Sequence, residues 1–508
     1  MKLLYKLLLL VAVFQFFSCK KDTTTISYAE KEVISVKGMD DIYPINIGQK
    51  LNIDPQVTSN KDADFDYVWG IYETNVQGYT PVLDTIGHSK QLDYTIIQPA
   101  KDWFLVLKVT NKKTGFSDYF TSTVRIGTEY TRGWYVIKDE NNMTDMDFFL
   151  TPQSITPTTI RENVYSLING RKLDGNAVML RFFTDYKAPI AGTTTYANTR
   201  SLFLMSEKDA AVVNLSTLKD IRNFNSMFYG VPAVKHPTMV GNDFLVYFMV
   251  NDGQLHSIIG QGPSTGIFGG RKINTTLDLP YYLSKYHIMF ISSYFFDELS
   301  SSFYSATDRS LYLSTIKDNP ATQLPANNNN KKLIYMGTKT TAPLAGFAIF
   351  QDKTDPASKI LASVSPNVNS FRMTYETLSP TDKVYNGSNY ALLFTDENMM
   401  YFSVGNEVWS RNLSNKFEQL QYTVPAGETI TFIRHRKATG TGVEAAYAYN
   451  YVMIGTKSGG NYKIRMFTKT SGNLAADPVF TLEGKGSATD AVYVGPSITT
   501  NMIYPSTY

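Results

Sequence analysis

Oxygen-bearing side chains alternate along one short segment and form the clearest cation-binding pattern in the chain. Asn60 is followed at every second position by an aspartate, up to Asp66, which is how the first ligands of an EF-hand loop are spaced around Ca²⁺. That loop also needs glycine at its sixth position and glutamate at its twelfth, where this chain has Phe65 and Ile71. We interpret the segment as an acidic loop leading into a strand, with calcium as the alternative and no other cofactor expected.

The five histidines show no metal-binding or catalytic spacing. None belongs to a His-Glu-x-x-His motif, which would place two imidazoles on one helix face for zinc, and we interpret each as a surface or loop residue: His88, His236, His256, His287 and His435. No glycine-rich phosphate loop occurs, and no spacing of acidic residues identifies the facing carboxylates of a glycosidase. The sequence therefore predicts no catalytic residue and no metal ligand, and it favours a binding protein over an enzyme.

Three tyrosines in a turn-rich segment are the candidate ligand-binding residues. Tyr281, Tyr282 and Tyr286 lie among glycine, proline and serine. Tyrosine rings stack on sugars and on peptide side chains alike, so they do not distinguish these two ligand classes. Core packing is the alternative role, because large aromatic side chains are mostly buried.

The first residues combine a basic start, an apolar run and one cysteine. Lys2 and Lys6 precede the apolar residues 7–17, a run too short to span a bilayer and typical of a secretory signal. Cys19, the only cysteine in the chain, follows this run. The spacing resembles a bacterial lipoprotein lipobox, in which the cysteine is acylated and becomes the first mature residue, although the bulky Phe16 and Phe17 depart from its usual pattern.

This resemblance divides the start of the chain into a signal peptide, residues 1–18, and a lipidated tether, residues 19–27. A plain thiol at Cys19 is the alternative. The Cys-Lys-Lys-Asp start of the tether resembles Bacteroidetes lipoproteins. Thr23 and Thr85 follow aspartates in a pattern that resembles the O-glycosylation sequon of those bacteria, and a polar linker or turn explains each equally well.

Composition narrows the function classes. The formal charge is +3 and falls to +1 once Lys2 and Lys6 leave with the signal, so the mature chain has no basic footprint for nucleic acid. Past Cys19 no apolar run is long enough for a membrane-spanning helix. Aromatic residues make up 13% of the chain and charged residues only 18%, a balance that suits half-buried β-strands.

Short alternating runs predict an all-β fold in two domains. Residues 28–127 contain about seven runs separated by turn signals, with Trp69 in a central one, the pattern of an immunoglobulin-like sandwich. Residues 128–508 repeat an apolar strand, a polar turn and an aromatic strand about every fifty residues, which predicts a β-propeller of about seven blades. A large sandwich or a pair of barrels is the alternative.

The Trp69 strand, the hairpin around Val106–Thr110 and the Arg132–Lys138 segment resemble the PKD-like family of Bacteroidetes lipoproteins. The family lies beside SusC/SusD-type outer-membrane importers, so the resemblance implies an accessory protein in the outer membrane, facing the cell exterior. Its implied partners are a SusC-like TonB-dependent barrel, a SusD-like lipoprotein and outer-membrane lipid. Its implied cargo is oligopeptide, with glycan second. The alternative is a cell-surface propeller hydrolase that acts on glycan or peptide.

Overall fold

The computed structural model describes residues 30–496 and 498, except for gaps at 75–79, 191–192, 244–245, 260–263, 275–276, 290–291, 308–309, 368–369 and 497. Cys19, Thr23 and the predicted signal peptide lie outside these residues. The described residues divide into two compact units: unit 1 runs to Ile97 and adds Asp102–Val124, and unit 2 comprises Gln98–Lys101 and the chain from Arg125 onward. In the described residues, no helix has the length and hydropathy needed to cross a membrane.

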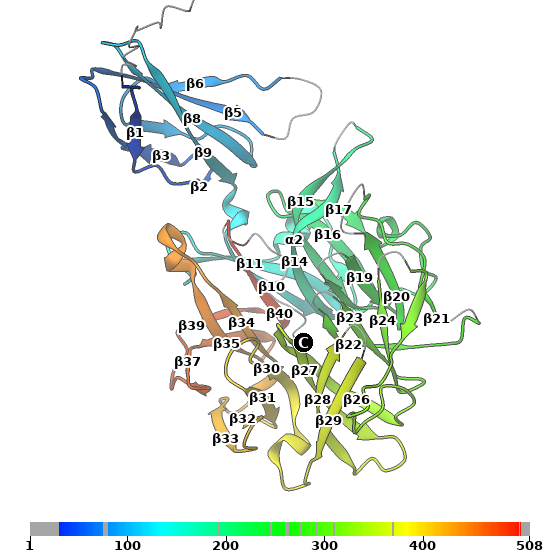
Figure 1. The fold of residues 1–508 in the computed structure, drawn as a ribbon. Helices are drawn as coiled ribbons and strands as arrows, with labels where there is room; N and C mark the ends of the chain where they lie inside the picture. Colours follow the sequence, from blue (N-terminus) through cyan, green and yellow to red (C-terminus); the bar gives the residue numbers. More distant parts are fainter. Residues whose placement is uncertain are drawn as a thin grey trace, which may run out of the picture. The chain divides into compact units, whose positions relative to one another are not determined.

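Unit 1 is a β-sandwich. In its described residues, one sheet has the order β2-β9-β8-β5-β6, and two short pairs, β1-β4 and β3-β7, make the second layer (Figure 1). The strands are β1 (Ile34–Lys37), β2 (Ile42–Asn46), β3 (Lys50–Ile53), β4 (Gln56–Ser59), β5 (Phe65–Glu73), β6 (Asp84–Gly87), β7 (Leu92–Thr95), β8 (Asp102–Asn111) and β9 (Ser117–Gly127). The predicted immunoglobulin/PKD-like sandwich is confirmed.

Residue alternation decides which face of the large sheet is buried. Leu105 and Leu107 of β8 pair with Ile71 and Trp69 of β5, and all four side chains are fully buried. Side chains at even positions of β8, such as Phe104, are directed to the opposite face, because successive strand residues alternate. The Trp69 indole donates a hydrogen bond to the carbonyl of Ser89, 3.0 Å away and just before β7, so one side chain ties the two layers together.

Unit 2 consists of seven sheets in its described residues, besides the small pair β37 (Lys469–Thr470) and β38 (Asn473–Leu474). Blade 1 has β40 (Ser487–Val494), β10 (Gly133–Glu140), β11 (Met143–Leu150), β12 (Thr159–Arg161) and the added β13 (Leu173–Asp174). Blade 2 has β14 (Ala177–Pro189), β15 (Tyr196–Ser206), β16 (Ala210–Asn214) and β17 (Asp220–Asn223). Blade 3 has β18 (Pro237–Asn242), β19 (Val246–Asn251) and β20 (Gln254–Ile259).

Blade 4 has β22 (Leu283–Met289), β23 (Ser293–Asp297), β24 (Ser302–Ala306), β25 (Tyr312–Thr315) and β21 (Ile273–Asn274). Blade 5 has β26 (Lys331–Thr341), β27 (Leu344–Asp352), β28 (Lys359–Asn367) and β29 (Ser370–Thr377). Blade 6 has β30 (Ser388–Leu392), β31 (Met399–Val404), β32 (Glu407–Asn412) and β33 (Glu418–Thr423). Blade 7 has β34 (Thr429–Ala438), β35 (Tyr449–Ser458), β36 (Asn461–Phe467) and β39 (Phe480–Lys485).

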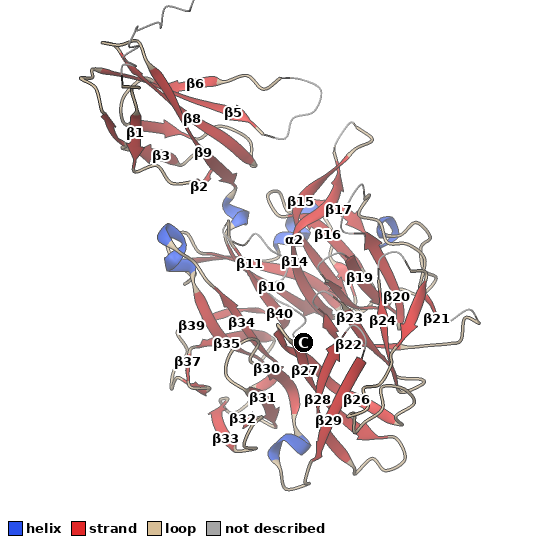
Figure 2. Cartoon of the chain, viewed as in Figure 1, coloured by secondary structure: helices blue, strands red, loops and turns tan. Residues whose placement is uncertain are grey.

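Helices are few and short in the described residues (Figure 2). They are the α-helix α2 (Val164–Asn169) and the 3-10 helices η2 (Glu129–Thr131), η3 (Phe224–Met227), η4 (Lys383–Asn386) and η5 (Gly442–Tyr447).

One end strand of each blade lies at the centre of a ring. These inner strands contact one another in the cyclic order β40, β14, β18, β22, β26, β30, β34 and again β40, and Figure 1 shows the blades arranged around them. Sheets packed radially about an axis are the architecture of a β-propeller. The predicted propeller is therefore confirmed, and in the described residues it has seven blades.

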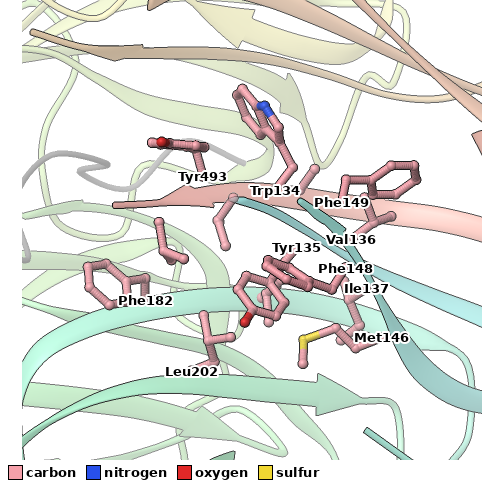
Figure 3. Packing of buried hydrophobic residues seen from close by; sticks show 14 of the residues in the cluster. Trp134, Tyr135, Val136, Ile137, Met146, Phe148, Phe149, Phe182, Leu202 and Tyr493 are labelled. Carbon is pink, nitrogen blue, oxygen red and sulfur yellow. The ribbon is translucent and has the colours of Figure 1, made fainter. Parts of the chain in front are cut away.

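The ring closes by joining the two ends of unit 2 in a single sheet. β40, near the end of the chain, pairs with β10, the first blade strand, with Trp134 opposite Tyr493 and Gly133 opposite Val494. Figure 3 shows the apolar cluster beside this seam, where Trp134, Tyr135 and Phe148 lie in the core. The Trp134 indole donates to the carbonyl of Ile155 at 3.0 Å, so its polar atom is satisfied within the core.

Candidate functional site

The structure places the three predicted tyrosines in different surroundings. Tyr281 is buried, and its hydroxyl donates to the carbonyl of Lys272 and accepts from the amide of Leu255. Tyr282 is about one-third exposed, and its ring lies where a side chain at Gly253 would stand. Tyr286 is half-buried on the inner strand β22. The structure thus does not bring the three together, and of them only Tyr286 lies on an inner strand.

The acidic loop of unit 1 is paired with lysines from the turn between β8 and β9. Lys113 Nζ lies 2.7 Å from Asp62 Oδ2, while Lys112 Nζ lies 2.9 Å from Asp64 and 3.7 Å from Asp66. These pairs account for the alternating carboxylates as a solvated, charge-paired loop. In the described part of the chain, no group of three or more His, Cys, Asp or Glu side chains is disposed to hold a metal ion.

Thr85 lies exposed on β6, the edge strand of the larger sheet of unit 1. Its backbone pairs with Gly70 of β5. The hydroxyl therefore lies on a part of the surface that a modifying enzyme is able to reach, and its glycosylation stays a prediction.

Three histidines are buried on strands, so their interpretation as surface or loop residues is wrong. His256, His287 and His435 are each less than 5% exposed. Burial lowers the pKa of His287 to about 3 and that of His435 to about 4. Nδ1 of His435 accepts from the amide of Phe394 at 3.0 Å, and Nε2 lies 2.8 Å from Asn450 Oδ1. Neutral imidazole fits these partners, so His435 serves the fold.

A Gly-x-Ser-x-Gly run does occur in the chain, at Gly262–Gly266. A nucleophile elbow needs such a run at a tight turn between a strand and a helix. Here Ser264 Oγ accepts a bond from the amide of Gly266 at 3.4 Å, and the Gly266 carbonyl accepts from the Tyr186 hydroxyl. Gly262 and Pro263 lie outside the described residues. The described part of the run belongs to the connection between β20 and β21, and the described residues of that connection form no helix.

Charged residues on four inner strands, together with one tyrosine, make up a set that we call the axial cluster. This axial cluster comprises Arg181 of β14, Lys285 and Tyr286 of β22, Arg434 and Arg436 of β34, and Asp490 of β40. Arg436 Nη2 lies 3.2 Å from Asp490 Oδ1, and Arg434 Nε lies 3.9 Å from the same atom. Phe432, Arg434 and Arg436 alternate along β34, so the two arginines lie on one face of blade 7, toward blade 1.

The surroundings of Lys285 disfavour its charged form. The pKa of Lys285 is lowered to about 8, first by burial and then by the positive charge of Arg434. Their strands, β22 and β34, are separated by β26 and β30 on one side of the ring and by β40, β14 and β18 on the other.

A second coupling crosses part of the ring at β18. Burial lowers the pKa of His287 most, and the charge of Arg181 lowers it further, although β18 lies between their strands. Gly241 of β18 leaves the space that this requires, since a Cβ atom there would lie 3.4 Å from His287 Nε2. The His287 ring therefore lies against the backbone of Gly241 on the neighbouring inner strand.

Three tyrosines from consecutive inner strands line one side of this region and form what we call the aromatic arc: Tyr286, Tyr335 and Tyr390. Ring centroids are 5.5 Å apart for Tyr286 and Tyr335 and 5.4 Å apart for Tyr335 and Tyr390. Lys285 Nζ lies 5.3 Å from the Tyr286 ring centroid. Tyr335 and Tyr390 are buried, whereas Tyr286 is half-buried, so Tyr286 offers the most accessible ring of the arc.

Carboxylates are scarce on the described inner strands, where Asp185 and Asp490 are the acidic residues. Asp185 accepts a hydrogen bond from the Tyr247 hydroxyl, and Asp490 is held by Arg436. Both acids of the described inner strands thus have a partner within the fold. The chemistry that the axial cluster supports best is non-covalent binding beside an aromatic ring.

Sequence analysis missed the arginines and the lysine of this cluster, although a signal was present. Arg181 interrupts the apolar run 177–183, whereas Lys285 and Arg434 have further polar residues beside them in their strands. Charged residues rarely occupy fully buried positions unless they are paired. A charge within a predicted inner strand therefore marks a candidate axial residue.

Replacing Lys285 with methionine is expected to raise the free energy of unfolding by about 1 kcal/mol at pH 7, within the usual gain when a strained functional residue is removed. The side chain retains solvent exposure, which screens much of the penalty of its charge. The gain should shrink as pH rises above about 8, because wild-type Lys285 then loses its proton in the folded state.

Denaturant unfolding at several pH values measures this effect. Lys332→Met is the matched control, since Lys332 is an exposed lysine on the inner strand β26, and its replacement should change stability by less than about 0.5 kcal/mol. A lower stability of the Lys285→Met variant at pH 7 would contradict the assignment of Lys285 as a strained cation.

Comparison with known proteins adds the following to this geometry. No curated protein matches the sequence of the chain. One family model does. Residues 19–177 match the PKD-like family. The PKD-like match begins at Cys19 and ends at the start of β14, so it covers the sandwich and the first strands of blade 1. The PKD-like part of the predicted resemblance is thereby confirmed.

Several solved structures have a similar backbone fold, but their sequences have low identity to this chain. A quinonprotein alcohol dehydrogenase-like protein from Bacteroides thetaiotaomicron is 13% identical, over 89% of this chain and 96% of that chain, with a TM-score of 0.38. The dihydro-heme d1 dehydrogenase NirN is 7% identical over 72% and 76%, with a TM-score of 0.40. AztD from Citrobacter koseri is 9% identical over 70% and 94%, with a TM-score of 0.25. None of these similarities extends to an activity or a ligand.

Proposed function

We propose that this chain is a non-catalytic accessory lipoprotein of a SusC/SusD-type outer-membrane importer, anchored through Cys19, and that its propeller captures nutrient for uptake. The observation that carries the binding role is the row of tyrosines on consecutive inner strands, Tyr286, Tyr335 and Tyr390, with Lys285 Nζ 5.3 Å from the Tyr286 ring centroid. Charges that gather around a propeller axis, with an aromatic side chain beside them, are suited to orient a ligand.

The importer context rests on the PKD-like match, which begins at Cys19, and on the resemblance of the chain start to a lipobox. In this proposal the sandwich is a spacer and docking module between the lipid anchor and the propeller. The acylated chain end faces outward from the outer membrane, and oligopeptide is the preferred cargo. A hydrolase is less favoured, because the acids of the described inner strands, Asp185 and Asp490, are engaged by Tyr247 and Arg436.

A mild-detergent pull-down of the tagged chain from native outer membranes tests the importer role. We expect stoichiometric recovery of a SusC-like barrel and a SusD-like lipoprotein, identified by mass. The Cys19→Ser variant, which cannot be acylated, should be lost from the membrane fraction. Recovery of the chain alone would contradict the role, and complete resistance to protease on intact cells would contradict the outward orientation.

A further inference from the structure

We propose that Tyr282, Asp252 and His236 form a surface site for a neutral pyranose sugar, which stacks on the Tyr282 ring and hydrogen-bonds to the other two side chains. The site lies where the hairpin between β19 and β20 of blade 3 meets the start of the inner strand β22 of blade 4. The inference goes beyond the proposed importer role, because Tyr282 lies outside the aromatic arc, about 13 Å along an extended chain from Tyr286.

The first support is the way in which the Tyr282 ring lies on Gly253. A Cβ atom at Gly253 would lie 2.4 Å from Cδ2, 2.5 Å from Cγ and 2.8 Å from Cε2 of this ring. Contact with the ring edge would make the first distance clearly shorter than the other two, so a face of the ring covers the glycine. The opposite face is directed away from Gly253, and Tyr282 remains 37% exposed. Among the described residues, no aromatic ring or cation stacks against it.

The backbone holds this ring in place before a ligand arrives. Asp252 and Gly253 have φ angles of 48° and 70°, as in the type I′ turn of a hairpin, and a larger residue than Gly253 would displace the ring. The Tyr282 amide donates to Oδ1 of the buried Asp297 at 2.7 Å, and the Tyr282 carbonyl accepts from the amide of Glu298 at 2.8 Å. A ring fixed in advance lowers the ordering cost of binding.

The second support is a pair of accessible polar side chains beside the ring. Asp252 precedes Gly253 in the turn, and its amide donates to the carbonyl of His236 at 2.8 Å. His236 Nδ1 lies 3.7 Å from Asp252 Oδ1, and the two side chains are 44% and 42% exposed. This distance is too long for a hydrogen bond. The carboxylate can therefore accept hydrogen bonds from ligand hydroxyl groups, and the imidazole can donate to them or accept from them.

Hydrogen bonds already made around the ring favour a sugar over an extended peptide. A peptide strand binds by adding to an open sheet edge. Here the carbonyl of Gly253 accepts from the amide of Leu283 at 2.9 Å, and the carbonyl of Leu255 accepts from the amide of Lys272 at 2.7 Å. A pyranose needs no main-chain partner, because its C–H face packs on an aromatic ring while its hydroxyl groups meet polar side chains. The charge of Asp252 favours a neutral sugar over an acidic one, since like charges repel.

Proton NMR titration of the full chain tests the inference. The neutral probes are cellotetraose, mannotetraose and galactotetraose, and the comparison probes are tetragalacturonate and acetylated tetraalanine amide. We expect at least one neutral sugar to bind at millimolar concentration, with the C–H protons that face the tyrosine ring shifted upfield. The acidic sugar should bind at least about fivefold more weakly than the best neutral one.

Variants locate the site. Tyr282→Ala should remove the upfield shift and weaken sugar binding at least about tenfold, whereas Tyr282→Phe keeps the ring and should change the affinity less than about threefold. Asp252→Asn should weaken binding about fivefold, since a charged acceptor forms the stronger hydrogen bond, and asparagine tolerates a positive φ. The matched control is Tyr312→Ala, which removes a tyrosine of similar exposure, 39%, from β25 of the same blade and should leave binding unchanged.

Absence of binding by all three neutral sugars would overturn the inference. Sugar binding that Tyr282→Ala leaves unchanged, or binding of the tetraalanine probe that requires Tyr282, would overturn it as well. Thermal unfolding confirms that each variant is folded, and Asp252→Asn keeps the test valid if Tyr282→Ala is not. The Tyr282→Ala chain should still recover the importer partners in the pull-down, so failure of this inference is distinguishable from failure of the proposed function.

Discussion

A chain that ends at Gly486 is expected to lose its folded propeller. Such a chain lacks β40, the inner strand of blade 1, whose Val492, Tyr493 and Val494 are buried. Each buried side chain of this kind contributes about 1.5–3 kcal/mol, so the three together approach the whole stability of a typical domain, about 5–15 kcal/mol. The truncation also exposes the hydrogen-bonding edge of β10, which invites aggregation.

Calorimetry and near-ultraviolet circular dichroism measure this loss. The Gly486-terminated chain should show no cooperative transition for unit 2. The matched control ends at Ile498, keeps β40 and the buried Ile498, and should retain a cooperative propeller transition. A cooperative propeller transition in the shorter chain would mean that β40 is not required to close the ring.

Replacing Lys138 with methionine is expected to destabilise the propeller by about 3–5 kcal/mol, the usual effect of removing one partner of a buried ion pair. Lys138 Nζ lies 3.3 Å from Asp147 Oδ1, and both side chains are almost completely buried. Asp147 also accepts bonds from the Asn163 amide and from the Tyr462 hydroxyl, each at 2.8 Å. Without Lys138, the carboxylate would remain buried with no cation beside it.

The pH dependence of this variant provides a second readout. Burial already raises the pKa of Asp147, against the charge of Lys138. Removing Lys138 raises that pKa further. A carboxyl group whose pKa is higher in the folded state stabilises the fold at low pH and loses that contribution as pH rises. The loss in the free energy of unfolding caused by Lys138→Met should therefore become smaller as pH falls from about 7 to about 5.

Two further variants complete the test by denaturant unfolding. Lys138→Met combined with Asp147→Asn should recover most of the loss, since the asparagine is neutral and keeps a carbonyl acceptor for the Asn163 amide. Lys463→Met breaks a pair with Glu483 at the same 3.3 Å but with both side chains largely exposed, and it should cost less than about 1 kcal/mol. Equal losses for Lys138→Met and Lys463→Met would show that burial does not set the strength of the pair.

The number of blades could be predicted from the sequence, whereas the two strands that close the ring could not. Apolar strands recurring about every fifty residues reflect the local alternation of each blade, which the sequence carries directly. The pairing of β10 with β40 joins residues more than three hundred positions apart. No local pattern marks Trp134 and Tyr493 as neighbours, because long-range pairing follows from the closing of the ring and not from either strand alone.

The candidate site shows the same division. The aromatic segment around Tyr286 was predicted from composition, whereas its adjacent Tyr281 proved to be a core residue with an internally bonded hydroxyl. Neighbouring positions differ in this way because Tyr281 precedes β22, while Tyr286 lies within it on an inner strand. The composition of the segment alone does not distinguish the buried Tyr281 from the half-buried Tyr286.

By itself, the sequence determined the all-β class, the sandwich followed by a propeller of about seven blades, and the resemblance of the chain start to a lipobox, because these depend on local order and on residue type. Only the tertiary structure decided which charges meet. Arg436 and Asp490 are 54 positions apart in the chain, and their side chains lie 3.2 Å apart because ring closure brings the inner strands β34 and β40 together.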